Sequence, residues 1–152
     1  MLQQLTGDFI SGLPPESLAK LEEIAREEHF VPGSQLFAEG GEHPDLHIIL
    51  QGHVRLEMAI PRRGRQPLLS LGTGDVLAWS ALLSGGRMTA SAIALDSVRT
   101  ASISGVVLRG LCEADPQLGY QMMKQLATAL SRRLIATRLQ LLDLFQEHEP
   151  VG

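Results

Sequence analysis

The sequence predicts an α+β fold that is mainly β: an antiparallel, jelly-roll-like β-roll with one helix before it and two after it. Residues 29–103 form short runs in which apolar and polar side chains alternate, and Gly or Pro separates the runs, which is typical of antiparallel strands. On both sides of this segment, apolar residues recur at steps of three and four, the period of an amphipathic helix.

Length and composition favour one soluble domain over residues 1–152. The chain has 152 residues, of which 20% are charged and 44% are apolar, as in ordinary globular proteins. The net charge of −4 argues against a nucleic-acid partner. Cys112 is the only cysteine, which excludes an internal disulfide and a multi-cysteine metal site. The N-terminus lacks a basic segment and no apolar run reaches about 20 residues, so we expect a cytoplasmic protein with no membrane partner.

The first helix is expected to begin at the Leu13-Pro14-Pro15-Glu16-Ser17 segment. Proline suits the first turn of a helix, and Glu16 would lie near the positive end of the helix dipole. An apolar stripe follows, and we expect the helix to end near Glu28. The stripe consists of Leu18, Leu21, Ile24 and Ala25.

The alternating runs indicate strands with tight turns between them. The clearest strand is 54–60, and the Pro61–Arg65 segment after it is expected to be an exposed hairpin tip whose three arginines are solvated. Asp96-Ser97 is expected to be the turn of a last hairpin. The remaining expected strands are 46–50, 68–71, 91–95 and 98–103.

Two C-terminal helices are expected within residues 104–147. Ser104 is a suitable N-cap for a short helix through about Glu113, in which Cys112 would be a small buried hydrophobe. Asp115-Pro116 then supplies an N-cap and a first-turn proline, and nothing interrupts the following helix until about Glu147.

The long helix carries a coiled-coil pattern that predicts a homodimer. One set of residues follows alternating steps of three and four, and a second set widens the apolar stripe. One face can pack on the roll and the other on a second copy; the alternative is a helix packed wholly on its own domain. The candidate interface is Ala127, Leu130, Leu134, Thr137, Leu141 and Leu144, and the second set is Met122, Leu126, Ile135, Leu139 and Leu142.

Residues 71–91 have the layout of a phosphate cradle. A Gly-rich turn leads into a segment long enough for only a turn or two of helix, and a Gly85-Gly86-Arg87 loop returns to a strand at Ser91. Backbone N–H groups at a helix start can face an anion, with Arg87 and Thr89 opposite. An ordinary connector between two strands is the alternative.

The order of these parts resembles the cyclic-nucleotide-binding domain found in the catabolite activator protein, in protein kinase A regulatory subunits and in cyclic-nucleotide-gated channels. The likeness extends from about Leu13 to Leu144. Gly74–Trp79 stands where the family has Gly-Asp-aromatic-Gly-Glu, and Arg87–Ser91 stands where it has Arg-Ser/Thr-Ala. The resemblance implies a β-roll whose phosphate-binding cassette, here residues 71–91, takes a cyclic nucleotide or another small anion and needs no further cofactor.

The cassette departs from the family pattern at the residues that hold the nucleotide. The family Glu, which accepts the ribose 2′-hydroxyl, falls on Trp79, and an indole N–H can only donate. The family Arg, which pairs with the phosphate, falls on Met88, and the family Gly falls on Ala78. The resemblance therefore implies a degenerate cassette that does not bind cAMP in the usual way. Trp79 either fills the pocket or forms an apolar wall that selects a different anion.

The candidate ligand-binding residues come from the cassette and the long helix. In the cassette they are the amide-bearing Ala78, Trp79, Ser80, Ala81 and Leu82, followed by Arg87, Met88, Thr89 and Ala90. The resemblance adds Thr137, at a position from which family dimers reach the base, and the neighbouring Arg138.

These features predict a non-enzymatic, stand-alone regulatory module for signal transduction, because no catalytic arrangement is evident. After the long helix no residues remain for a helix-turn-helix, so we expect no DNA-binding domain, and a separate effector protein would read the signal in trans. One alternative is a structural dimerisation module with a vestigial pocket. Another is a metal-dependent cupin enzyme using His43, His47 and His53 with Glu39 or Glu57; these lack the His-x-His pair, and we interpret them as surface histidines with no metal.

Overall fold

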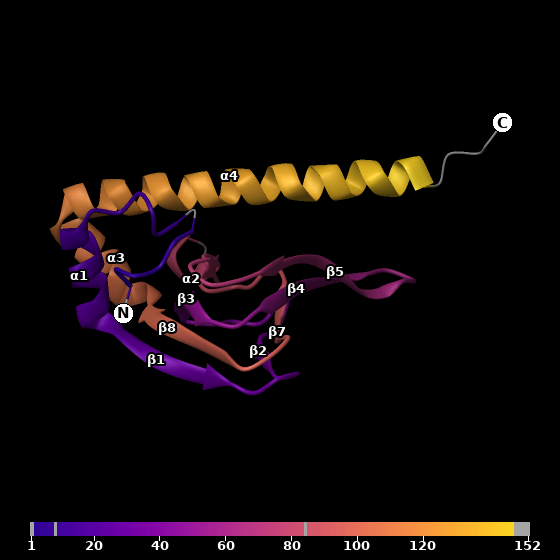
Figure 1. Cartoon of the computed structure of the whole chain (residues 1–152), viewed down its shortest axis with the longest axis horizontal. Coiled ribbons are helices and arrows are strands. Elements are labelled where there is room, and N and C mark those ends of the chain that lie inside the picture. Colours follow the sequence, from indigo (N-terminus) through magenta and orange to yellow (C-terminus); the bar gives the residue numbers. More distant parts are fainter. Residues whose placement is uncertain (1, 8, 84, 148–152) are drawn as a thin grey trace.

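The computed structural model describes residues 2–7, 9–83 and 85–147 (Figure 1). Within them the helices are α1 (Pro15–Ile24), α2 (Ser80–Leu83), α3 (Gly105–Ala114) and α4 (Pro116–Glu147). The strands are β1 (Ala25–Phe30), β2 (Gln35–Phe37), β3 (Asp45–Gln51), β4 (Val54–Ile60), β5 (Gly64–Leu71), β6 (Val76–Leu77), β7 (Ser91–Ala94) and β8 (Val98–Ser104).

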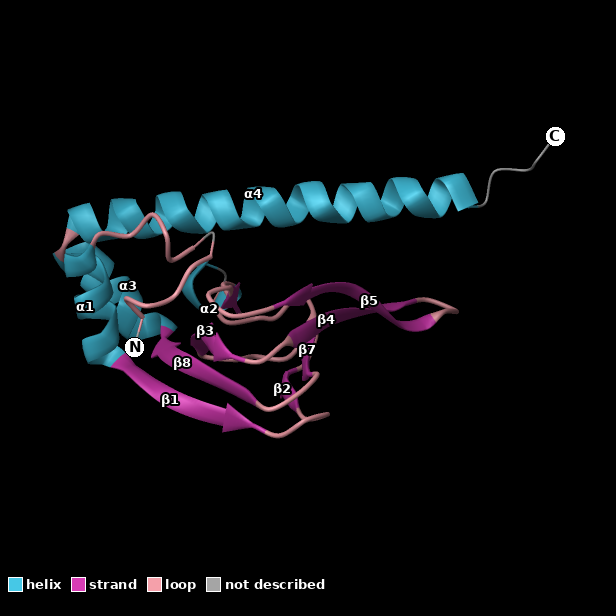
Figure 2. Cartoon of the chain, in the orientation of Figure 1, coloured by secondary structure: helices cyan, strands magenta, loops and turns pink. Residues whose placement is uncertain are grey.

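The strands form two four-stranded sheets in which every pairing is antiparallel. Their orders are β1-β8-β3-β6 and β2-β7-β4-β5. Figure 2 shows the roll lying below α4, with α1 and α3 gathered at the N-terminal end of that helix. The β4–β5 hairpin extends in the same direction as the C-terminal half of α4 (Figure 1). The predicted mainly β α+β fold is confirmed.

The core has two parts, one on each side of the β1-β8-β3-β6 sheet. One part packs residues such as Leu21, Ile48 and Leu126 between this sheet and the helices. The other fills the space between the two sheets, with Ile49 and Met88 among its members. Strand β3 contributes to both parts and is buried from Asp45 to Leu50, so it is a central strand with no solvent-facing side.

The first helix is shorter than the sequence predicts. It ends at Ile24, and Ala25–Phe30 form β1, so the roll begins at residue 25 and not at 29. Ala, Arg and Glu favour helix by propensity. Strand β1 nevertheless pairs with β8 over its whole length, from Ala25 opposite Ile103 to Phe30 opposite Val98. This distant partner satisfies the backbone and overrides the local preference.

The predicted last hairpin is also wrong. Strands β7 and β8 flank Asp96-Ser97, but they belong to different sheets and do not pair with each other. Asp96 instead accepts a hydrogen bond from the backbone N–H of His53, at 2.7 Å, which anchors the corner to the β3–β4 turn. The chain crosses between sheets here, as strands do at the corners of a β-sandwich.

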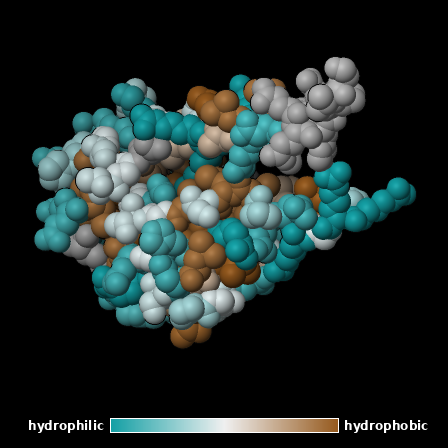
Figure 3. All heavy atoms as spheres, turned by 45° about the vertical axis from the view of Figure 1, so that its right-hand side comes forward, coloured by the Kyte–Doolittle hydropathy of each residue, from teal (hydrophilic) through white to brown (hydrophobic). Residues whose placement is uncertain are grey.

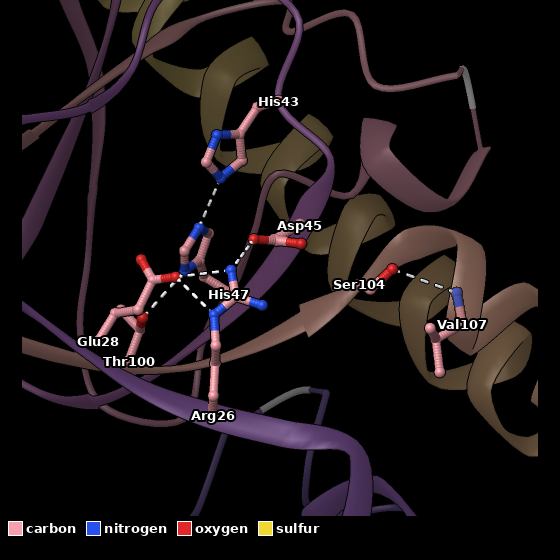
Figure 4. Close-up of polar contacts among 8 residues, drawn as sticks. All are labelled: Arg26, Glu28, His43, Asp45, His47, Thr100, Ser104 and Val107. Atoms are coloured by element: carbon pink, nitrogen blue, oxygen red, sulfur yellow. Dashed lines mark hydrogen bonds and ion pairs between the residues drawn. The ribbon is translucent and has the colours of Figure 1, made fainter.

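The predicted helix starts are confirmed, and the hairpin tip lies where it was expected but is shorter than Pro61–Arg65, because β5 begins at Gly64 and contains Arg65. The Ser104 hydroxyl accepts from the Val107 N–H at 3.3 Å at the start of α3 (Figure 4), and Asp115 accepts from the Leu118 N–H at 3.2 Å at the start of α4. Residues 61–63 form the exposed turn between β4 and β5. No helix in the described part of the chain is long and apolar enough to cross a membrane.

Candidate functional site

The cassette is built on a short turn from β6 into α2. Ala78 has φ 58°, a left-handed conformation, at the position where the sequence comparison with the family predicts glycine. The N–H of Ala81 bonds to the carbonyl of Ala78 and the N–H of Leu82 to that of Trp79, both at 3.0 Å. Two of the amides predicted to face a ligand are therefore engaged within the turn, and the side chains of Ala81 and Leu82 are buried in the protein.

The cassette encloses a pocket of only about 30 Å³. That volume holds a water molecule or two, whereas small-molecule sites usually offer about 300 Å³ or more. Trp79 is half-buried and packs against the helix-side core, and Met88 is buried between the sheets. The lining is mostly apolar and consists of Phe37, Leu56, Leu77, Ala78, Trp79, Ser80, Met88, Thr89, Ala90 and Arg133.

The loop before β7 places Met88 and Arg87 on opposite sides. Met88 is 3% exposed and lines the pocket, whereas Arg87 is exposed and does not. The backbone of Arg87 forms an isolated antiparallel bridge with Glu42, which fixes this alternation. Thr89 lines the pocket, whereas Arg87, the arginine of the cassette, is not among its lining residues.

Arg133 on α4 is the pocket cation that sequence reasoning missed. Arg133 lines the pocket, and its guanidinium donates a hydrogen bond to the backbone carbonyl of Val76 on β6. It also borders a neighbouring pocket of about 250 Å³ between α4 and β5–β6, which includes Arg132 and Asp75. The available signal was its spacing, because Arg133 precedes Thr137 by one helical turn and so shares its face.

Thr137 and Arg138 do not line the cassette pocket. The Thr137 hydroxyl donates to the backbone carbonyls of Arg133, at 3.1 Å, and Leu134, at 2.9 Å, within its own helix. Arg138 is exposed. The structure thus gathers Ala78, Trp79, Ser80, Met88, Thr89 and Ala90 around one pocket and leaves Ala81, Leu82, Arg87, Thr137 and Arg138 outside it.

The histidines predicted to be on the surface are partly inside. His47 is fully buried because β3 is covered on both faces, while His53 is exposed beside Asp96. The Nε2 atoms of His43 and His47 lie 2.7 Å apart, and Nδ1 of His47 lies 2.9 Å from the Thr100 hydroxyl (Figure 4). Burial, with the nearby His43, lowers the pKa of His47 to about 4. Across residues 2–7, 9–83 and 85–147, no three His, Cys, Asp or Glu side chains are placed to hold a metal.

Cys112 on α3 behaves as a packing residue. It is half-buried against the helix-side core, and burial raises the pKa of its thiol, which disfavours the reactive thiolate.

The candidate dimer face on α4 is uncovered over its C-terminal half. Leu130 is half-buried on the core and Ala127 is exposed, while Leu134 is 52% and Leu141 54% exposed. The side chain of Leu144 lies outside the described residues. Figure 3, turned to bring the right-hand side of Figure 1 forward, shows hydrophobic residues at the upper edge of the molecule, where α4 lies, and a separate hydrophobic area across its middle. Further exposed apolar residues of α4 are Ile135, Leu139 and Leu142.

Comparisons with known proteins place the fold in a defined group. A CRP-like cAMP-activated global transcriptional regulator of Mycobacterium tuberculosis is 31% identical over 137 residues, which are 90% of this chain and 59% of that protein. The Thermus thermophilus catabolite activator protein is 25% identical with a TM-score of 0.74, covering 92% of this chain and 63% of that one. A cyclic nucleotide-binding domain from Methylobacillus flagellatus has the same fold, with a TM-score of 0.81, 22% identity, and coverage of 93% and 79%.

The chain spans less than two thirds of the length of the curated relative. That relative is named a transcriptional regulator, so these comparisons do not support the expectation that nucleic acid is not a partner. Residues 27–115, more than half of the 152, match the model of the cyclic nucleotide-binding domain. The chain belongs to the cyclic nucleotide-binding domain family.

Proposed function

We propose that this chain is a non-enzymatic regulatory module whose cassette does not take a cyclic nucleotide through the family's usual Glu and Arg contacts. The observation that carries the proposal is the pocket of about 30 Å³ lined by Trp79 and Met88. A nucleotide could enter only if both side chains moved out of the positions where they are packed.

The chemistry of the two side chains points the same way. The Trp79 N–H cannot accept a hydrogen bond from a ribose hydroxyl, and the Met88 thioether cannot neutralise a phosphate. Hydrogen bonds to charged groups contribute about 1.5–3 kcal/mol each. Losing both contacts would therefore weaken cyclic-nucleotide binding by several orders of magnitude.

The ligand that suits the pocket is a small anion placed between Arg133 and Thr89. The two residues line the same pocket and come from different elements, α4 and the loop before β7. An anion at the Arg133 guanidinium would compete with the Val76 carbonyl for its N–H groups. Binding would then alter the contact between α4 and β6, which gives the ligand a direct route to the long helix.

The output that we favour is a change in the α3 and α4 surfaces of a homodimer, read by a separate effector protein. Leu134 and Leu141 are more than half exposed, as an interface awaiting a second copy would be. In this proposal residues 1–152 form one domain that responds as a unit. The net charge of −4 disfavours direct contact between this surface and nucleic acid, in contrast to what the name of the M. tuberculosis relative would suggest.

Isothermal titration calorimetry with cAMP, cGMP, phosphate and small carboxylates tests the proposal. The wild type should give no cyclic-nucleotide signal, and the double variant Trp79→Glu with Met88→Arg should gain one. Trp79→Phe with Met88→Leu is the matched control, because it changes the same two positions without adding a polar contact. Circular dichroism checks that both variants fold. Micromolar cAMP binding by the wild type would overturn the proposal.

The exposed face of α4 also favours a second candidate, a structural dimerisation module with a permanently filled pocket. Thermal unfolding separates the two candidates. An anion that binds only the folded state, present at a concentration about 100 times its dissociation constant, adds roughly 2.7 kcal/mol to the free energy of unfolding. If an Arg133→Gln variant shows the same anion response as the wild type, the anion site proposed here is wrong and the structural module is preferred.

A further inference from the structure

A pair of histidines, His43 and His47, lies behind the cassette and takes no part in the proposed ligand site. Their rings stack with centroids 5.0 Å apart, and their Nε2 atoms are in hydrogen-bond contact at 2.7 Å (Figure 4). His47 continues the chain of contacts to the buried hydroxyl of Thr100. A line of hydrogen bonds therefore runs from the half-buried His43 into the space between the two sheets.

The charged groups around the histidine pair come from β1 and from β3 itself. Arg26 on β1 donates to Glu28, at 3.0 Å, and to Asp45 on β3, so a single guanidinium is shared by both carboxylates. Arg26 disfavours a positive charge on His47, whereas the carboxylates of Glu28 and Asp45 favour it.

The uncharged neighbours come from β1, β2 and β8. The ring of Phe30 on β1 packs edge-on to His47, and Phe37 on β2 packs against His43. Ser102 stands opposite His47 in the β3–β8 pairing, and its buried hydroxyl has no hydrogen-bond partner among the described residues. On these sides the pair therefore meets rings and hydroxyl groups, which stabilise a positive charge less well than water does.

The loop that carries His43 is hydrogen-bonded directly to the cassette. The backbone N–H of His43 donates to the carbonyl of Gly86 at 2.7 Å. The carbonyl of Met88 accepts from the backbone N–H of Gly40 at 2.8 Å, and the Met88 N–H donates to the carbonyl of Gly41 at 2.9 Å. The two backbones approach so closely that a Cβ at Gly86 would lie 2.9 Å from the His43 carbonyl oxygen. Any displacement of the His43 loop must therefore move residues 86–88.

Two further contacts connect the histidine pair to β6 and to α3. His47 on β3 stands opposite Leu77 on β6, the residue before Ala78. The carbonyl of Pro44, next to His43, accepts a hydrogen bond from the Gly105 N–H at 2.9 Å, at the start of α3. The pair is therefore adjacent to cassette residues on both sides of α2, and to the start of α3.

We propose that the His43–His47 pair is an acid-sensitive link that sets the position of the cassette. With one proton between the two Nε2 atoms, the contact holds residues 40–44 against the roll. When each ring has taken up a proton from solvent, two N–H groups face each other and two positive charges repel. The His43 loop then separates from His47 and carries residues 86–88 with it. This link acts on the cassette whatever ligand the cassette holds.

The environment of the pair restricts this change to acid conditions. Burial lowers the pKa of both histidines, and the pKa of His47 is about 4. The first proton goes to the half-exposed His43, whose Nε2–H can still donate to neutral His47. Only the second proton removes the hydrogen bond, so the contact is retained at neutral pH.

Trp79 provides a specific readout because it is the only tryptophan and lies in the cassette. We expect the Trp79 fluorescence of the full chain to change on titration from pH 7 to about one unit below the His47 pKa of about 4, while far-UV circular dichroism stays constant. In the His43→Gln variant, this transition should disappear or move by about one pH unit or more, since only one titrating ring remains. His53→Gln, which changes an exposed histidine, is the matched control and should titrate like the wild type.

Three results would overturn the inference. They are an unchanged fluorescence curve in His43→Gln, loss of the transition in His53→Gln, and fluorescence and circular dichroism changing together in the wild type. Imidazole NMR of the unmodified protein adds a measurement that needs no substitution. The resonances of His43 and His47 must titrate in the same pH range as Trp79 fluorescence, and titration in a separate range would also contradict the link.

Discussion

The guanidinium of Arg133 on α4 donates a hydrogen bond to the backbone carbonyl of Val76 on β6. Val76 lies two residues before Ala78, where the left-handed turn of the cassette begins. The long helix is therefore tied to the strand from which the cassette starts. The backbone of β6 thus provides one direct contact between the long helix and the cassette.

Replacing Arg133 by Ala should weaken this attachment. The carbonyl of Val76 loses a charged donor, and because Arg133 is partly exposed we expect the free energy of unfolding to fall by only about 1 kcal/mol. Urea denaturation measures the change. Arg138→Ala is the control, since Arg138 is exposed and outside the pocket and should shift stability by less than about 0.5 kcal/mol. Equal effects of the two variants would contradict the attachment.

The left-handed backbone of Ala78 leads to a second prediction, about the stability of the cassette turn. A left-handed φ of 58° costs an alanine about 1–2 kcal/mol, and glycine avoids most of this at the expense of a more flexible unfolded chain. Ala78→Gly should therefore raise the free energy of unfolding by up to about 1 kcal/mol. Ala78→Val should lower it by at least about 1 kcal/mol, because a branched side chain tolerates this conformation poorly. A stabilised Val variant in thermal denaturation would refute the argument.

The parts of the fold that were predicted from the sequence are those fixed by local chemistry. Ser104 and Asp115-Pro116 set the starts of α3 and α4 because their side chains or ring act within one turn of the helix. The strand 54–60 was also found with its correct ends, since period-two alternation and flanking turns determine it.

The parts that were missed depend on partners far along the chain. Strand β1 forms from helix-favouring residues because β8 pairs with it, about 70 residues away. Alternation along β3 could not reveal that both faces are covered, so the burial of His47 was not foreseen. Arg133 enters the site because α4 passes close to β6, and the only sequence signal was its place one helical turn before Thr137, which does not by itself separate it from a solvated arginine.

The buried His47 predicts a fall in stability in mild acid. Its pKa is about 4 in the folded protein against 6.5 for the free side chain, so below pH 6.5 the unfolded chain binds a proton that the folded protein does not. The free energy of unfolding is therefore unaffected by this group above pH 6.5 and decreases as the pH falls from 6.5 towards 4. Between pH 7 and pH 5 the expected loss is about 2 kcal/mol.

Urea denaturation of the wild type and of His47→Gln, at pH 7 and pH 5, measures this contribution. The Gln variant is expected to be less stable at pH 7, because a buried hydrogen bond is altered, but to lose about 2 kcal/mol less between the two pH values. An identical pH dependence in both proteins would show that His47 is not the group responsible.

The uncovered half of α4 predicts a homodimer. Like charges placed on this half should dissociate it. Leu134 and Leu141 are 52% and 54% exposed and lie on one seam of a/d positions, so a second copy would bring each close to its equivalent. Changing both to Glu keeps helix propensity but places like charges across the interface. Sedimentation should show a dimer for the wild type and at least about 100-fold weaker association for the double variant. Val31→Glu alters an exposed apolar residue in the β1–β2 turn, far from α4 in Figure 1, and should leave the dimer intact. A monomeric wild type would contradict the prediction that α4 forms a homodimer interface.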